Sequence, residues 1–102
     1  MVLYINTRDP KIIEVALKKD DKVIDKLVDH NEYGSQVLLP RIVKLLKKNK
    51  LEFTDLEAVE TEEGPGSFTG LRVGASVAQT LGFVLNIPVN GKFNKPVNLR
   101  YT

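Results

Sequence analysis

The order of apolar and polar segments predicts one α/β domain built around a mixed β-sheet. Three short segments rich in β-branched residues, joined by tight turns, are typical of an antiparallel meander. Two helical segments follow, and each leads into another short apolar segment, so that two crossover units extend the sheet. The predicted order is β-β-β-α-β-α-β over residues 1–102, a common size for a single domain.

The first three strands are expected at 2–7, 12–19 and 22–29. The turn "RDPK", with Pro10 inside it, separates the first two strands, and "DD" separates the second from the third. The polar stretch "HNEYG" then ends the meander.

A helix is expected from Gln36 to about Asn49, with Ser35 as its N-cap and Pro40 in its early turns. A fourth strand is predicted at 56–61. A second helix should run from Ser67 or Phe68 to Leu85 and stop at "NIP". A fifth strand is predicted at 88–93, and residues 93–102 are expected to cover an edge strand or to add one. This order resembles the ribonuclease-H-like fold, which also forms the repeating half of the actin and sugar-kinase superfamily.

The composition excludes several kinds of site. The chain has no cysteine and a single histidine, His30, so thiolate and multi-histidine metal sites are excluded, and no metal or other cofactor is expected. The formal net charge of +2 is too balanced to indicate nucleic-acid binding. No long apolar run or signal-like N-terminus is evident, which predicts a cytoplasmic protein that does not engage a membrane.

The chemistry associated with this fold lacks its usual residues. A two-metal nuclease needs converging carboxylates, but Asn6 occupies the expected position in the first strand, and residues 34–50 contain no Asp or Glu. Asn6 also stands where the related ATP-binding proteins carry an aspartate. The glycine-rich loop "GPGSFTG" lacks the lysine of a Walker A motif. We therefore expect no enzymatic activity.

The glycine-rich loop itself admits two further interpretations. Ser67 could act as a nucleophile only with a base, and nothing in the sequence places His30 near it, so a helix cap is the preferred role. Alternatively, N–H groups at the start of the second helix could hold an anion or a nucleotide phosphate. That alternative binding loop comprises Gly66, Ser67, Phe68, Thr69 and Gly70.

Both helices carry more apolar surface than packing on one sheet requires. The second helix also contains a ridge of small residues repeated every fourth position, formed by Gly70, Gly74, Ala78 and Gly82. Glycines within a helix are destabilising, so the ridge indicates close packing. From physics alone, the ridge could pack against this domain's own sheet or first helix, or it could belong to a surface shared with a partner's helices.

The segment "EGPGSFTGLRVGASVAQTLGFVLNIPV" resembles the signature of the TsaB (YeaZ) family, partners of the tRNA-modification enzyme TsaD. "LYINT", "EVAL" and "SQVLLPRIVKLL" are similar to the family pattern as well, so the resemblance covers nearly all of residues 1–89. It implies a role in forming threonylcarbamoyladenosine (t6A) on tRNA, as a scaffold rather than as the catalyst.

The resemblance also implies the partners. TsaB proteins dock on TsaD through the two helices and self-associate through the same surface, so a TsaD-like partner is expected, with a homodimer in its absence. A TsaE-like ATPase and tRNA would be reached only through the complex. The implied interface residues are Leu38, Leu39, Ile42, Val43, Leu46, Arg72, Val73, Ser76, Val77 and Thr80. Family members are about twice as long and usually have "IDT" where this chain has "INT", which predicts a minimal form without the second domain.

Overall fold

The computed structural model describes residues 1–30 and 34–101. Three strands come first, β1 (Val2–Asn6), β2 (Ile12–Lys19) and β3 (Lys22–His30). Helix α1 (Gly34–Lys48), a 3-10 turn (Phe53–Asp55), strand β4 (Ala58–Thr61) and helix α2 (Phe68–Leu85) follow. The predicted break at "HNEYG" lies mostly outside the described residues. The predicted α/β fold class is confirmed.

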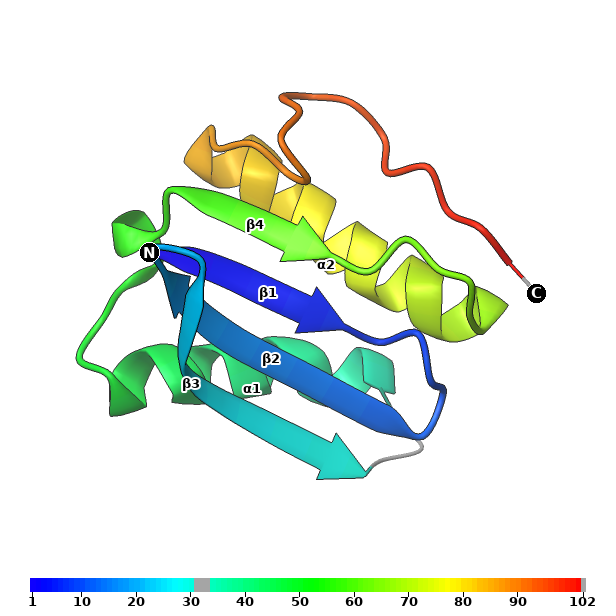
Figure 1. Cartoon of the computed structure of the whole chain (residues 1–102), viewed down its shortest axis with the longest axis horizontal. Helices are drawn as coiled ribbons and strands as arrows, with labels where there is room; N and C mark the ends of the chain where they lie inside the picture. Colours follow the sequence, from blue (N-terminus) through cyan, green and yellow to red (C-terminus); the bar gives the residue numbers. More distant parts are fainter. Residues whose placement is uncertain (31–33, 102) are drawn as a thin grey trace.

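The four strands form one mixed sheet in the order β3-β2-β1-β4 (Figure 1). Strand β1 is central, pairing antiparallel with β2 and parallel with β4, so that Tyr4 lies opposite Ala16 on one side and Glu60 on the other. Strand β2 pairs antiparallel with β3, and the register shifts between Leu17 and Lys18. The meander therefore forms one side of the sheet and the first crossover adds β4 to the other.

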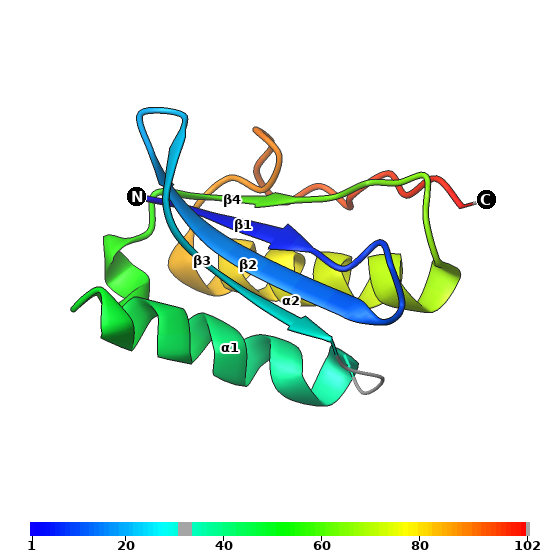
Figure 2. The same cartoon turned by 60° about the horizontal axis from the view of Figure 1, so that its bottom comes forward.

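Both helices cover the same face of the sheet, α1 beneath β2 and β3, and α2 beneath β4 and β1 (Figure 2). Alternate strand residues point to this face, and the apolar stripe of each helix closes over them. The largest fully buried side chains are Leu3, Ile5, Leu17, Leu38, Ile42, Leu45, Leu71, Val15 and Val59. Burying each of these side chains contributes about 1.5–3 kcal/mol, so this layer provides most of the driving force for folding.

The predicted fifth strand is wrong. Only Val89 bridges to β4, in parallel with Val59, and it then bridges back to Lys92 in a tight turn. The turn arises because Asn90 and Gly91 both have positive φ, at 50° and 80°. "PVNGKF" has a composition typical of a strand, but it also contains an Asn-Gly pair, which favours a tight turn. The chain forms the turn.

The C-terminal segment returns along the β4 edge toward the start of α2 (Figure 1). The Arg100 N–H donates to the Glu63 carbonyl at 2.7 Å, and Tyr101 makes a parallel bridge to Gly66. The Arg100 guanidinium donates to the Gly64 carbonyl at 3.1 Å. The segment covers the loop after β4 and forms no regular strand of its own.

The helix ends follow the sequence signals with one exception. Ser67 is the N-cap of α2 and Asn86 is its left-handed C-cap, as predicted. Helix α1 begins at Gly34, two residues earlier than expected, so Ser35 lies inside the helix and the prediction that it is the N-cap is wrong. By length and composition alone α2 could cross a membrane, but it lies on β1 and β4 and contributes buried residues to the core, as core helices of soluble proteins also do.

Candidate protein-docking surface

The glycine-rich loop is shaped by close backbone contacts. Gly64 has a φ of 111°, a left-handed conformation that favours glycine. A Cβ on Gly66 would lie 2.7 Å from Arg8 Cβ and 2.9 Å from the Arg8 carbonyl oxygen. The Ser67 N–H donates to that same carbonyl at 2.9 Å. The loop therefore packs closely against Arg8, just after the end of β1. The positive φ of Gly64 and this close packing at Gly66 account for the two glycines.

Ser67 acts as a helix cap. Its Oγ accepts a hydrogen bond from the Gly70 N–H at 3.3 Å, and its carbonyl accepts one from Leu71. Two of the five N–H groups in the alternative anion-binding loop, those of Ser67 and Gly70, are thus committed within the chain. His30 ends β3 at one edge of the sheet, whereas Ser67 follows β4 at the other, with β2 and β1 between them. The topology gives Ser67 no histidine base.

The small-residue ridge of α2 faces this domain's own sheet. A Cβ on Gly70 would overlap the Thr7 carbonyl oxygen, and one on Gly74 would overlap Thr7 Oγ1. At Gly82 the added Cβ would come within 2.5 Å of Val89 Cγ2. Ala78 is fully buried in the core. Of the two possible roles of the ridge, internal packing against the sheet is the one that describes it.

Three of the residues implied for the interface belong to the core. Leu38 and Ile42 are fully buried and Leu46 is nearly so, because the helix stripe that contains them faces the sheet. Their apolar atoms are already covered within one chain. The expectation that Leu38, Ile42 and Leu46 contact a partner is corrected accordingly.

The remaining residues leave one apolar strip across both helices, which we call the docking face. Leu39 is 46% exposed and Val43 is half-buried on α1, while Val73 and Val77 are half-buried on α2. Polar members add hydrogen-bonding groups along α2. The docking face is defined as Leu39, Val43, Arg72, Val73, Ser76, Val77, Thr80 and Val84.

The interface residues implied by the family resemblance leave out the apolar residues at the end of α2. Val84 is 70% exposed and lies seven residues after Val77, two helical turns further along the same face. Phe83 beside it is 77% exposed. The signal was present in the sequence, because "GFVL" places two large apolar residues outside the stripe that the sheet requires. Val84 therefore extends the docking face by about one helical turn beyond Thr80.

A groove of about 500 Å³ runs along the first half of α2, lined by Phe68, Thr69, Arg72, Val73, Ser76 and Val77. At its end the Arg72 guanidinium lies 5.3 Å from the Phe68 ring centre, and the Tyr101 ring lies 4.7 Å from the same ring. This stack holds Arg72 beside the apolar strip. The groove is suited to a partner side chain.

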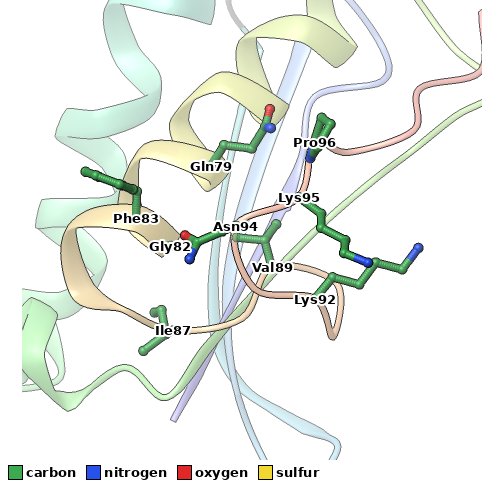
Figure 3. A pocket seen from close by; sticks show the side chains of 9 residues that line it. All are labelled: Gln79, Gly82, Phe83, Ile87, Val89, Lys92, Asn94, Lys95 and Pro96. Carbon is green, nitrogen blue, oxygen red and sulfur yellow. The ribbon is translucent and has the colours of Figure 1, made fainter.

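A second hollow of about 390 Å³ lies at the other end of α2 (Figure 3). Gln79, Gly82 and Phe83 border it from the helix, while Lys92 and Lys95 come from the turn after Val89 and extend away from α2. Among the described residues that line it, these two lysines are the ionisable groups, and they do not form a general acid–base pair.

The open face of the sheet carries ion pairs and hydrogen bonds. The Tyr4 hydroxyl donates to Glu62 Oε2 at 2.7 Å, and Lys18 Nζ lies 2.7 Å from Glu60 Oε1. Burial, reinforced by the Glu62 carboxylate, raises the pKa of Tyr4 well above its ordinary value, so that its hydroxyl stays protonated. Asn6 accepts from the Arg8 N–H and donates to Glu14. These groups are paired with one another within the chain.

The mixed sheet with two helices on one face places the chain in the class of actin-like ATPase-fold domains. The family model described as "TsaD: tRNA N6-adenosine threonylcarbamoyltransferase" matches residues 29–91. The chain belongs to the TsaB (YeaZ) family within this wider group.

Named relatives agree with that assignment. TsaB of Bacillus subtilis strain 168, named as a tRNA threonylcarbamoyladenosine biosynthesis protein, is 32% identical over 90 residues, covering 87% of this chain and 39% of the relative. TsaB of Buchnera aphidicola subsp. Schizaphis graminum is 43% identical over 92 residues, covering 89% and 43%. The solved structure of YeaZ from Pseudomonas aeruginosa superposes with a TM-score of 0.79 at 30% identity, covering 86% of this chain and 42% of that one. The chain spans less than half the length of these relatives.

Proposed function

We propose that this chain is a non-catalytic partner subunit in t6A formation, docking on a TsaD-like enzyme through the docking face. The observation that carries the proposal is the apolar strip across α1 and α2, with Leu39 and Val84 substantially exposed although both helices already bury a full stripe in the core. Exposed apolar surface of this kind is typical of an interaction site. The family's role in t6A biosynthesis supports the identity of the partner.

The non-catalytic part of the proposal is supported by the residues at the end of β1. Asn6 is held between Glu14 and the Arg8 backbone, and it is a neutral amide at the position where related ATP-binding proteins use a carboxylate. Ser67 serves as a cap. In this proposal a TsaE-like ATPase and tRNA are reached only through the assembled complex, and self-association competes for the same docking face.

The test is co-purification with the TsaD-like protein of the same genome, using Val84→Glu on the docking face. Val84→Glu places a carboxylate within the apolar strip. Forming the complex would remove water from this charge and supply no hydrogen-bonding or ionic group in return, so the complex should be abolished. The matched control is Val28→Glu, since Val28 is 46% exposed on β3 and lies on the open face of the sheet. Both variants should keep the wild-type circular dichroism spectrum. If Val84→Glu binds as well as Val28→Glu does, the docking face is not the interface.

A further inference from the structure

The turn after α2 contains a pair of residues that is chemically labile. Asn90 is the one asparagine in the sequence that is followed by a glycine, Gly91. Asparagine is among the thermolabile residues, because the backbone nitrogen of the next residue can attack its side-chain amide and release ammonia. Glycine favours this attack, since it has no side chain to keep that nitrogen away and its backbone turns freely.

The attacking nitrogen is accessible in the folded chain. Gly91 is exposed, and a Cβ built on it would meet no atom within 4 Å. The turn is closed by the flanking residues Val89 and Lys92, whose backbones exchange two hydrogen bonds of 3.0 Å. The Gly91 N–H donates to none of the described residues. Water therefore reaches the group that must lose a proton before it attacks.

The amide that would be attacked is held in place. Asn90 is half-buried, its Nδ2 donates to the Thr61 carbonyl at 3.1 Å, and its Oδ1 accepts from the Thr61 N–H at 2.9 Å. The Asn90 N–H also donates to the Val59 carbonyl at 2.9 Å. These bonds fix the plane of the amide against the edge of β4. Attack requires Asn90 Cγ to face the Gly91 nitrogen and Nδ2 to leave, so the bonds to Thr61 must open first.

We propose that Asn90 is a deamidation site, and that its rate in the folded protein is set by the opening of its two side-chain hydrogen bonds to Thr61. The Gly91 nitrogen gives its proton to water and bonds to Asn90 Cγ. The Cγ–Nδ2 bond breaks, and Nδ2 takes a proton from water and leaves as ammonia. Water then opens the resulting succinimide ring and returns a proton to the Gly91 nitrogen.

The site of water addition decides the product. Addition at Cγ breaks the bond from Cγ to the Gly91 nitrogen and leaves an aspartate. Addition at the main-chain carbonyl carbon of Asn90 breaks the bond from that carbon to the same nitrogen, and leaves an isoaspartate whose main chain continues through Cγ. The reaction needs water and no partner protein, so it is tested apart from the proposed function.

Either product should release the turn from β4. A carboxylate has no N–H, so in the aspartate product an oxygen replaces Nδ2, which lies 3.1 Å from the Thr61 carbonyl oxygen. Two acceptors then face each other, and the Thr61 carbonyl loses its donor in a partly buried position. The isoaspartate lengthens the main chain within a turn that Val89 and Lys92 close. Deamidation would therefore loosen the segment that covers the edge of β4.

The first experiment compares deamidation in the folded chain and in the chain unfolded by guanidinium chloride, at one mildly alkaline pH. Trypsin cleavage after Arg72 and Lys92 releases a peptide that contains both Asn86 and Asn90, and mass spectrometry of its fragments assigns the reaction to either residue. Asn86 is the internal control, because the branched Ile87 follows it. In the unfolded chain Asn90 should react faster than Asn86, and folding should slow Asn90 by about tenfold or more. If Asn90 reacts no faster than Asn86 when unfolded, it is not a deamidation site. An equal or faster rate in the folded chain overturns the protection by Thr61.

The second experiment tests whether the bonds to Thr61 set the rate. Exchange of the Thr61 N–H with deuterium reports the opening of its bond to Asn90 Oδ1. As guanidinium chloride is raised below the unfolding transition, the exchange rate of Thr61 and the deamidation rate of Asn90 should change by the same factor. A deamidation rate that stays constant while Thr61 exchange accelerates overturns the proposal.

The effect of the product is tested with Asn90→Asp, which reproduces the aspartate. It should unfold at a lower guanidinium chloride concentration than Asn94→Asp, the matched control. Asn94 also has a positive φ but is exposed. Exchange of the Thr61 N–H should be faster in Asn90→Asp than in the control. If both properties are the same in the two variants, deamidation does not release the turn.

Discussion

The Asn90 side chain makes the hydrogen bonds to the Thr61 backbone that the backbone of a neighbouring strand would otherwise make. Its amide donates to the Thr61 carbonyl at 3.1 Å, and its Oδ1 accepts from the Thr61 N–H at 2.9 Å. Asn90 can do this because its backbone turns away from the sheet with a φ of 50°. Asparagine tolerates this left-handed conformation better than most residues. The exposed edge of β4 is thereby satisfied at the point where its backbone partner ends.

Replacing Asn90 with alanine should destabilise the protein by about 1–3 kcal/mol, because both backbone groups of Thr61 lose their partner in a partly buried position. Asn94→Ala is the matched control, since Asn94 also has a positive φ, at 53°, but is exposed. Both variants place alanine at a position with positive φ. The difference between their free energies of unfolding in urea therefore measures the contribution of the Asn90 side-chain hydrogen bonds. Equal losses in the two variants would mean that the amide contributes nothing.

Gly74 shows why the ridge of small residues matters. A Cβ there would overlap Thr7 Oγ1 and lie 3.1 Å from Thr61 Oγ1. Although alanine is the better helix former by about 1 kcal/mol, overpacking costs about 1–3 kcal/mol. Gly74→Ala should therefore lower the free energy of unfolding. The loss should be smaller in a Thr7→Ala background, where one of the two hydroxyls is gone, and a double-mutant cycle measures the coupling. Strictly additive losses would contradict this contact.

At the scale of the elements, periodicity predicted most of the fold. Strand β2 begins and ends where predicted, and α2 has its predicted caps because Ser67 and Asn86 are strong local signals. The fifth strand could not be predicted, since its composition favours β structure while the left-handed backbone at Asn90 and Gly91 decides for a turn. The start of α1 was also predicted in the wrong place. Ser35 is a favourable N-cap residue, but the helix begins before it, at Gly34.

The candidate site was less predictable than the fold, because a helix sequence gives the width of an apolar face but not which part of it the sheet covers. Leu38, Ile42 and Leu46 have the spacing of a core stripe and lie in the core, whereas Leu39 next to them is exposed. Only the packing of α1 on β2 and β3 separates the two sets. The pairing of Arg41 and Lys48 with β3 carboxylates has the same origin, since it depends on which strand α1 covers.

The contact between α1 and β3 should respond to acid through Asp25. The Asn49 amide donates to Asp25 Oδ2 at 3.0 Å, and this bond, followed by Lys48, lowers the pKa of Asp25 below 3.8. A carboxyl group whose pKa is lower in the folded than in the unfolded state stabilises the protein at pH values above its unfolded-state pKa. This stability is lost as the pH falls through the folded-state pKa. Asn49→Ala should therefore raise the pKa of Asp25 toward 3.8, and Lys48→Ala should raise it by less. Titration of the carboxyl signal by NMR measures both, and the reverse order would contradict the assignment.

For the whole molecule, the two faces differ in chemistry as well as in charge. The open face of the sheet pairs its own polar groups, because Lys18 forms an ion pair with Glu60 and the Tyr4 hydroxyl donates a hydrogen bond to Glu62. The helix layer leaves Leu39 and Val84 exposed, and its cations Lys44, Lys47 and Arg72 form no ion pair within the described residues. The open face also exposes Val23 and Val28, but its charged groups are paired, whereas on the helices exposed apolar side chains lie together with cations that make no ion pair. This asymmetry is why the proposal places docking on the helices.

If the chain is a non-catalytic subunit, Ser67 should contribute to its stability but not to the reaction that forms t6A. Ser67→Ala removes the cap bond to the Gly70 N–H and should cost about 1 kcal/mol in the free energy of unfolding. Ser67→Asp keeps a capping oxygen without a hydroxyl nucleophile, so it should recover most of that stability. With the TsaD-like enzyme, at a temperature where every variant is folded, both should support t6A formation at the wild-type rate per complex, measured by nucleoside analysis of modified tRNA. If t6A formation is lost in both while the complex persists, Ser67 takes part in the reaction and the scaffold role is wrong.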